Sequence, residues 1–121
     1  MATMRYLIAD VDRAVEFYTT HLGFTVETQM GSAFAIVARG DLRLWLSGPT
    51  SSAARPMPDG RAPEPGGWNR FVIETENLAT RVAAMRAAGL SLRNDIVTGP
   101  GGKQILLEDD SGNPIELFEP A

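Results

Sequence analysis

The sequence predicts an α+β fold built from two copies of a βαβββ module within one domain. The order strand, helix and three strands occurs twice along the 121 residues, and the two helix-ending glycines, Gly23 and Gly89, lie about 66 residues apart. An apolar fraction of 44% with 21% charged residues is ordinary for a globular domain, and the length suits one domain better than two. We place module 1 at about residues 1–47, a connector at 48–67 and module 2 at about residues 68–121.

The first module begins with a predicted strand over Arg5–Ala9 and a helix that runs to about Leu22. Asp10 is a suitable N-cap because its carboxylate can accept hydrogen bonds from the unpaired amides of the first turn. Apolar residues recur at intervals of three and four and form one face: Val11, Ala14, Val15, Tyr18 and Leu22. Glycine-containing turns then separate three predicted strands: Phe24–Met30, Ala33–Ala38 and Leu42–Ser47.

The second module repeats this order. A strand over Arg70–Thr75 precedes a helix that begins at Glu76 and Asn77 and ends at Gly89. Its apolar face consists of Leu78, Val82 and Met85. Three further strands are predicted, the last after a turn of Asp, Ser, Gly and Asn: Ser91–Val97, Lys103–Glu108 and Pro114–Glu119.

The connector Gly48–Gly67 is rich in proline, glycine and serine and has no hydrophobic period. It is either a flexible link or a lid over a binding site. The second interpretation arises because structureless loops longer than about 12–15 residues are uncommon in compact domains unless they serve a site.

Composition excludes several functional classes. The formal charge of −4 and a pI near 4.9 argue against a nucleic-acid partner or an acidic membrane surface. The chain has no cysteine, which excludes disulfides, thiolate metal sites and cysteine nucleophiles. Because no signal peptide or apolar run of about 18 residues is evident, we expect a cytoplasmic protein with no membrane partner. The single histidine, His21, is expected at a helix C-terminus, where an exposed imidazole is favourable.

The run Asp10–Tyr18 with Leu22–Phe24, and the ending Glu108–Leu117, closely resemble the vicinal oxygen chelate superfamily of glyoxalases, bleomycin-resistance proteins and ring-cleaving dioxygenases. With the repeated module, the resemblance covers essentially the whole chain. The segments Arg55–Gly60 and Gly66–Arg70 are similar to a bacterial subgroup described only as glyoxalase/bleomycin-resistance-like. The resemblance implies two modules whose sheets form an open cup with the helices outside, and commonly a homodimer.

The resemblance also implies three metal-ligand positions, which fall here on Thr3, Arg70 and Glu116. Threonine is a poor ligand for a divalent metal, and the fixed charge of arginine repels a cation. One carboxylate cannot supply the three protein ligands of a catalytic centre. If the family's ligand positions are aligned one or two residues later or earlier, they fall on Arg5 or Asn69, and neither change makes a metal site. We therefore predict no metal or other cofactor, with Glu116 as the only family-type ligand retained.

Alternation along the strands predicts which side chains face away from the helices and into the cup. The predicted ligand-binding residues are Arg5, Trp45, Arg70, Glu74, Gln104, Glu116 and Phe118. Aromatic walls with a few convergent polar groups are typical of small-molecule sites. Trp45 is also consistent with a core residue, and Arg70 with Glu116 is also consistent with a structural ion pair that replaces the lost metal site.

Two functions follow. In the first, which we favour, the protein binds a small aromatic or cationic molecule without metal, as bleomycin-resistance relatives do. Trp45 and Phe118 would stack on that ligand, and Glu116 and Glu74 would hold a positive group. The alternative is an enzyme of lactoylglutathione lyase, isomerase or dioxygenase type that uses the same cavity. Without metal, only Arg70 and Arg5 could then stabilise an oxyanion, and Glu116 would act as general base.

Overall fold

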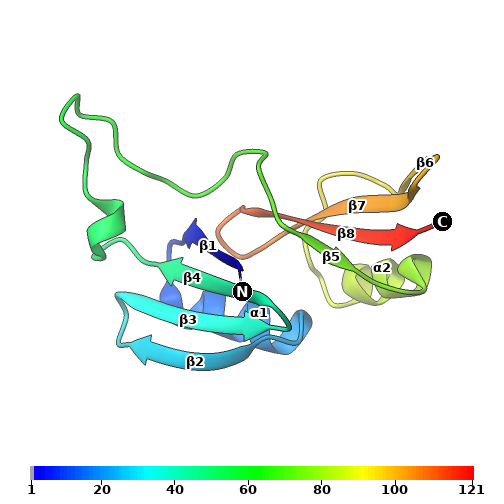
Figure 1. Cartoon of the computed structure of the whole chain (residues 1–121), viewed down its shortest axis with the longest axis horizontal. Helices are drawn as coiled ribbons and strands as arrows, with labels where there is room; N and C mark the ends of the chain where they lie inside the picture. The colour runs from blue at the N-terminus through cyan, green and yellow to red at the C-terminus, as the bar shows by residue number, and fades with distance from the viewer. Residues whose placement is uncertain (1) are drawn as a thin grey trace. The chain divides into compact units, whose positions relative to one another are not determined.

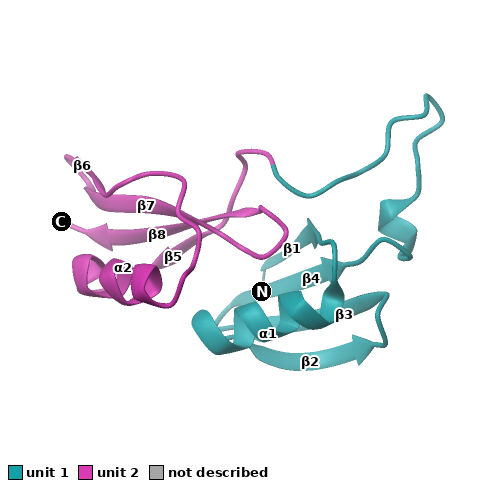
Figure 2. Cartoon of the chain, turned by 180° about the vertical axis from the view of Figure 1, so that it is seen from behind, with its two compact units in different colours: residues 1–66 teal, residues 67–121 magenta. Residues whose placement is uncertain are grey.

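A computed structural model describes residues 2–121. The chain divides into two compact units, one that ends at Gly66 and one that comprises Gly67–Ala121 (Figure 2). Neither helix in this part of the chain is long and apolar enough to span a membrane.

The first unit contains one four-stranded sheet and one long helix (Figure 1). Its elements are β1 (Ala2–Leu7), α1 (Val11–His21), β2 (Thr25–Met30), β3 (Phe34–Arg39) and β4 (Leu42–Ser47). The strand order is β1-β4-β3-β2, with β1 parallel to β4 and the other pairs antiparallel. The helix α1 packs on one face of this sheet, mainly against β3 and β4.

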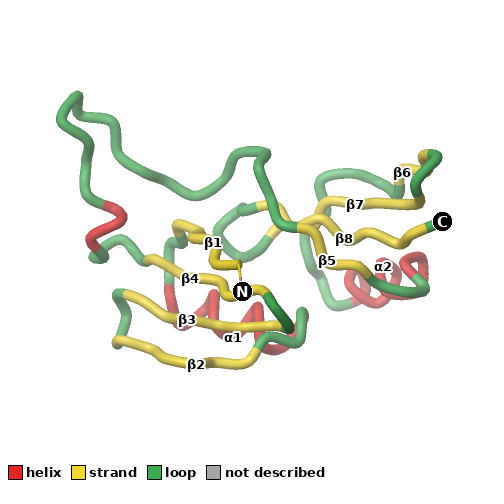
Figure 3. Tube along the Cα trace, viewed as in Figure 1, coloured by secondary structure: helices red, strands yellow, loops and turns green. Residues whose placement is uncertain are grey.

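The second unit has the same topology. Its elements are β5 (Val72–Glu74), α2 (Leu78–Ala87), β6 (Val97–Gly99), β7 (Gly102–Glu108) and β8 (Pro114–Pro120). The strand order β5-β8-β7-β6, with β5 parallel to β8, corresponds strand by strand to the first sheet. The predicted α+β fold of two βαβββ modules is therefore confirmed. Between β4 and β5 the chain is mostly loop, with one 3-10 turn, η1 (Ser52–Ala54) (Figure 3).

The first helix begins and ends where its sequence predicts. The side chain of Asp10 accepts a hydrogen bond from the Arg13 amide at 3.1 Å, and Gly23 follows the helix with a φ of 72°. This positive φ favours glycine because it has no Cβ to clash with the backbone. The buried face of the helix differs in one member, because Phe17 is buried and Val15 only partly so.

The core of the first unit lies between α1 and the sheet. Leu44 and Leu46 of β4 are fully buried, as are Ala35 and Val37 of β3, while Tyr6 of β1 is 5% exposed. The side chains between these residues lie on the opposite face of the sheet, because successive residues of a strand alternate. Every residue of the edge strand β2 is exposed.

The second helix is capped from a distant strand. Asn77 has a φ of 54°, and its side chain makes no capping hydrogen bond. Instead, Glu119 of β8 accepts a hydrogen bond from the Leu78 amide at 3.0 Å. A carboxylate at this position also interacts favourably with the positive end of the helix dipole. This contact joins α2 to the face of β8 that carries the buried Ile115 and Leu117.

The predicted strand Ser91–Val97 is wrong. This segment has only an isolated bridge between Leu92 and Leu107, and the strand β6 begins at Val97. The Asn94 side chain accepts the hydrogen bond of the Leu106 amide at 3.0 Å and so replaces a strand backbone there. The strand predicted from Arg70 is also shorter, because β5 comprises only Val72–Glu74.

Candidate functional site

Arg70 and Glu116 form a partly buried ion pair in the second unit. The Nη2 and Nε atoms of Arg70 both donate to Oε1 of Glu116, at 2.7 and 3.0 Å. Arg70 Nη1 also donates to the Trp68 carbonyl at 3.2 Å. The side chains of Arg70 and Glu116 are 29% and 10% exposed, so the carboxylate is almost removed from solvent and its charge is compensated by one guanidinium.

Four predicted residues lie on the face of this sheet that is opposite α2. In the strand register, Glu116 lies beside Val72 and Leu106, and Phe118 lies beside Glu74 and Gln104. Glu116 and Phe118 are two residues apart on β8 and therefore share a face, whereas Glu119 faces the helix that it caps. Glu74 is exposed, and Phe118 and Gln104 are partly buried.

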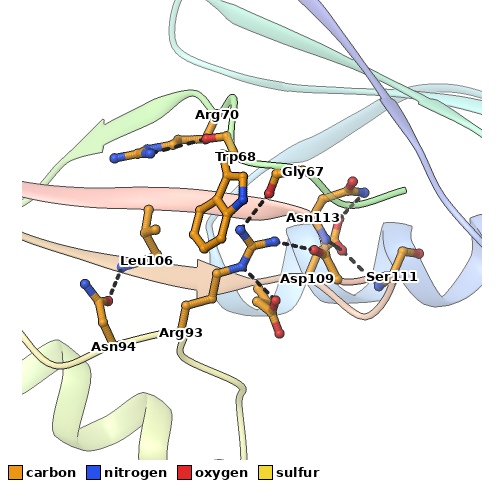
Figure 4. Close-up of polar contacts among 11 residues, drawn as sticks. Gly67, Trp68, Arg70, Arg93, Asn94, Leu106, Asp109, Ser111 and Asn113 are labelled. Carbon is orange, nitrogen blue, oxygen red and sulfur yellow. Dashed lines mark hydrogen bonds and ion pairs between the residues drawn. The ribbon is translucent and has the colours of Figure 1, made fainter. Parts of the chain in front are cut away.

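Next to the ion pair, Arg93 organises the start of the second unit (Figure 4). Its guanidinium donates to Glu108 Oε2 at 2.8 Å, to the Gly67 carbonyl at 2.6 Å and to the Gly112 carbonyl at 2.9 Å. The same guanidinium lies over the ring of Trp68, 4.6 Å from its centroid. Arg93 thus holds the segment whose carbonyl at Trp68 contacts Arg70.

In the first unit, the sheet face opposite α1 carries a second cluster, formed around Trp45. Arg5 of β1 lies beside Trp45 of β4 in the parallel register, and its guanidinium is 4.9 Å from the ring centroid. Phe34 of β3 meets the Trp45 ring edge to face, with centroids 5.8 Å apart. Arg5 Nη1 also donates to the Ser47 hydroxyl at 3.3 Å. A guanidinium over an indole ring is a favourable cation–π contact.

A cavity of about 390 Å³ adjoins this cluster within the first unit. It is lined by Arg5, Met30, Ala33, Phe34, Thr50, Ser51 and Ser52. Its volume lies within the range of about 300–1,000 Å³ that is common for small-molecule sites. The start of the connector therefore forms one wall of a cavity, next to the aromatic cluster.

The structure therefore brings the predicted residues together in two groups. Arg5 and Trp45 contact each other in the first unit. Arg70 and Glu116 contact each other in the second, on the sheet face that carries the rest of the predicted set: Glu74, Gln104 and Phe118. That the two groups line one common cup stays a prediction.

The residues at the expected metal positions do not fit a divalent cation. Oε1 of Glu116 already accepts two hydrogen bonds from Arg70, whose positive charge occupies the place of a second ligand. Thr3 lies beside Arg43 in the strand register, and His21 is an exposed residue whose ring lies 5.4 Å from that of Phe17. Within residues 2–121, no three His, Cys, Asp or Glu side chains are grouped as metal ligands.

Sequence reasoning did not single out Phe34 and Arg93. The alternation of the buried Ala35 and Val37 with Phe34 was a usable signal for the first, because it places Phe34 on the face of Trp45. Arg93 had no such signal, because its segment was predicted as a strand and its partners lie in other loops.

Comparison with known proteins identifies the family. The sequence model of the Glyoxalase/Bleomycin resistance protein/Dioxygenase superfamily matches residues 2–117. The chain belongs to this superfamily. Among curated proteins, no sequence matches this member of the superfamily significantly.

Solved structures of the superfamily agree with this fold. A lactoylglutathione lyase from Agrobacterium tumefaciens is 18% identical, with a TM-score of 0.75 over 98% of this chain and 92% of its own. TnmS3, an antibiotic binding protein from Streptomyces sp. CB03234, is 23% identical, with a TM-score of 0.74 over 98% and 93%. A superfamily member from Sphaerobacter thermophilus DSM 20745 is 21% identical, with a TM-score of 0.76 over 98% and 95%. At these identities the likeness shows the fold alone.

Proposed function

We propose that this superfamily member binds a small organic molecule without a metal ion, in a sequestration or resistance role. The observation that carries the proposal is the cavity of about 390 Å³ in the first unit, which Arg5 and Phe34 line beside Trp45. Such a combination of aromatic surface with a few polar groups is the usual composition of a ligand site. The description of TnmS3 as an antibiotic binding protein agrees with this proposal.

The Arg70–Glu116 pair supports the metal-free part of the proposal. A carboxylate that accepts two guanidinium hydrogen bonds on one oxygen has already found its positive partner. A metal ion at Glu116 would lie close to the fixed positive charge of Arg70, which opposes the binding of a second cation.

The same pair argues against the catalytic alternative. A lyase- or isomerase-type reaction without metal needs a guanidinium aimed at a developing oxyanion and a carboxylate that can accept a proton. Here Arg70 and Glu116 contact each other at 2.7 Å, so the charge of each is already paired. Arg5, the other arginine considered for an oxyanion, lines a cavity of the first unit in which no carboxylate of the described residues is present to act as base.

Calorimetric titration tests the proposal. Protein dialysed against EDTA is screened with aromatic compounds by thermal shift, and compounds that stabilise it are titrated with and without the chelator. We expect binding that EDTA leaves unchanged, because no metal takes part. Trp45→Ala should weaken binding, whereas Trp68→Ala, which removes an indole that is 68% exposed in the other unit, should not. A requirement for added zinc, nickel, manganese or iron would contradict the proposal.

A further inference from the structure

Arg5 differs from the ion-pairing arginines because no carboxylate of the described residues contacts it. Arg43, Arg61, Arg70, Arg86 and Arg93 each form an ion pair with an acidic residue. Within residues 2–121, the guanidinium of Arg5 has only the Ser47 hydroxyl and the Trp45 ring as partners. Most of its N–H groups therefore have no acceptor within the protein, and Arg5, which is exposed, lines a cavity.

A second donor without an acceptor lies in the same cluster. The indole Nε1 of Trp45 is buried and has no hydrogen-bond partner in the described part of the chain. A buried N–H without an acceptor costs about 1–3 kcal/mol, so native proteins usually satisfy such groups. The Phe34 ring has no such acceptor atom, and the thioether sulfur of Met30 is only a weak acceptor. The cluster thus has a surplus of donors and of positive charge, in contrast to the acidic chain as a whole.

We propose that the cavity of the first unit binds an aromatic compound with an anionic group, such as an aryl carboxylate, and that Arg5 holds the anion. This inference rests on the proposed binding function and names its ligand class. The guanidinium can donate two parallel hydrogen bonds to a carboxylate. Phe34 and Met30 supply apolar surface for the ring system in the same cavity.

Trp45 acts in this site as a positioning residue. Its ring lies beneath the guanidinium of Arg5 and against the edge of Phe34, so it contacts two residues that line the cavity. Contact with the indole restricts the guanidinium before the ligand arrives, and this preorganisation lowers the cost of binding.

The two acidic residues that were expected to attract a cationic ligand, Glu116 and Glu74, do not lie in this cavity. Glu116 is neutralised by Arg70, and Glu74 is exposed in the second unit. A cationic ligand would have to approach Arg5 without any carboxylate in the first-unit cavity, since none lines it.

Three probes of one shape and different charge test this inference: 2-naphthoate, the neutral 2-naphthamide and 2-naphthylmethylammonium. Each is titrated calorimetrically into the wild-type protein and into three variants. Arg5→Gln removes the charge, and Arg5→Lys keeps the charge but loses the planar fork. The matched control is Arg39→Gln, which removes an exposed arginine of β3 in the same unit that forms no ion pair within residues 2–121.

We expect 2-naphthoate to bind the wild type at least about tenfold more tightly than 2-naphthamide, with the ammonium compound weakest. Arg5→Gln should abolish this preference, Arg5→Lys should reduce it, and Arg39→Gln should preserve it. In Trp45→Ala the preference should shrink, and Trp45→Phe should restore part of it, because phenylalanine still offers a ring to the guanidinium.

Equal binding of the three probes, or an anion preference that survives Arg5→Gln, would overturn the inference and leave the proposed binding function intact. A preference lost equally in Arg39→Gln would also overturn it, because the effect would then come from general charge. If none of the three probes binds at millimolar concentration, this inference is wrong, whereas the proposed function is tested separately by the thermal-shift screen and the titration with chelator.

Discussion

Removal of Arg70 from its ion pair should destabilise the protein more than removal of both partners. In Arg70→Met, the carboxylate of Glu116 stays on a side chain that is only 10% exposed and loses both hydrogen bonds from the guanidinium. The loss of one partner from a fully buried pair costs about 3–5 kcal/mol, whereas a surface pair contributes about 0.2–1 kcal/mol. Because Arg70 is 29% exposed, we expect a value between these limits, about 2 kcal/mol.

The double variant Arg70→Met/Glu116→Gln removes the uncompensated charge as well. Its free energy of unfolding should lie between that of Arg70→Met and that of the wild type, because no charge is left unpaired, although the amide at position 116 loses the hydrogen bonds of the guanidinium. Urea denaturation of wild type, both single variants and the double variant completes a double-mutant cycle. A loss below about 0.5 kcal/mol in Arg70→Met, or a double variant that is less stable than either single variant, would refute this reasoning.

Three further predictions concern the second unit. Gly102→Ala should destabilise the second unit by more than about 1 kcal/mol, the least cost expected for a strained backbone position. The residue has a φ of 146°, and a Cβ there would collide with the Glu119 carbonyl, whereas Gly101→Ala is the matched control. Glu119→Ala should cost about 1 kcal/mol in urea denaturation, since the Leu78 amide loses its cap, and an unchanged midpoint would contradict this. Arg93→Lys should cost about 1–2 kcal/mol, because lysine cannot serve three acceptors in one plane, and a melting temperature equal to wild type would exclude that role.

Local signals predicted much of the fold. The Leu42–Ser47 strand has the bounds that the sequence predicts, and Asp10 caps the first helix as expected, because both depend on residues close in the chain. The repeated order of elements predicted two sheets of equal topology for the same reason.

Features that depend on distant residues were not predictable. The strand expected over Ser91–Val97 fails because the Asn94 side chain takes over a hydrogen bond from Leu106, twelve positions away. The cap of the second helix comes from Glu119, 41 positions after Leu78. The hydrophobic periodicity of a short stretch of sequence cannot reveal hydrogen bonds between residues that are so far apart in the chain.

The candidate site shows the same limit. Strand alternation placed Arg5 and Trp45 on one face, but the contact between them requires the parallel register of β1 and β4. Likewise, the residue types at Arg70 and Glu116 suggested an ion pair, yet only the structure shows both guanidinium bonds on one carboxylate oxygen.

Elemental analysis tests the central claim most directly. Purified protein is incubated with zinc, nickel, manganese and iron salts, dialysed and measured by mass spectrometry, with Glu116→Ala as the comparison. Because Arg70 occupies the carboxylate that a metal would need, we predict far less than one metal ion per chain for both proteins. A content close to one ion per wild-type chain that is lost in Glu116→Ala would contradict metal-free binding.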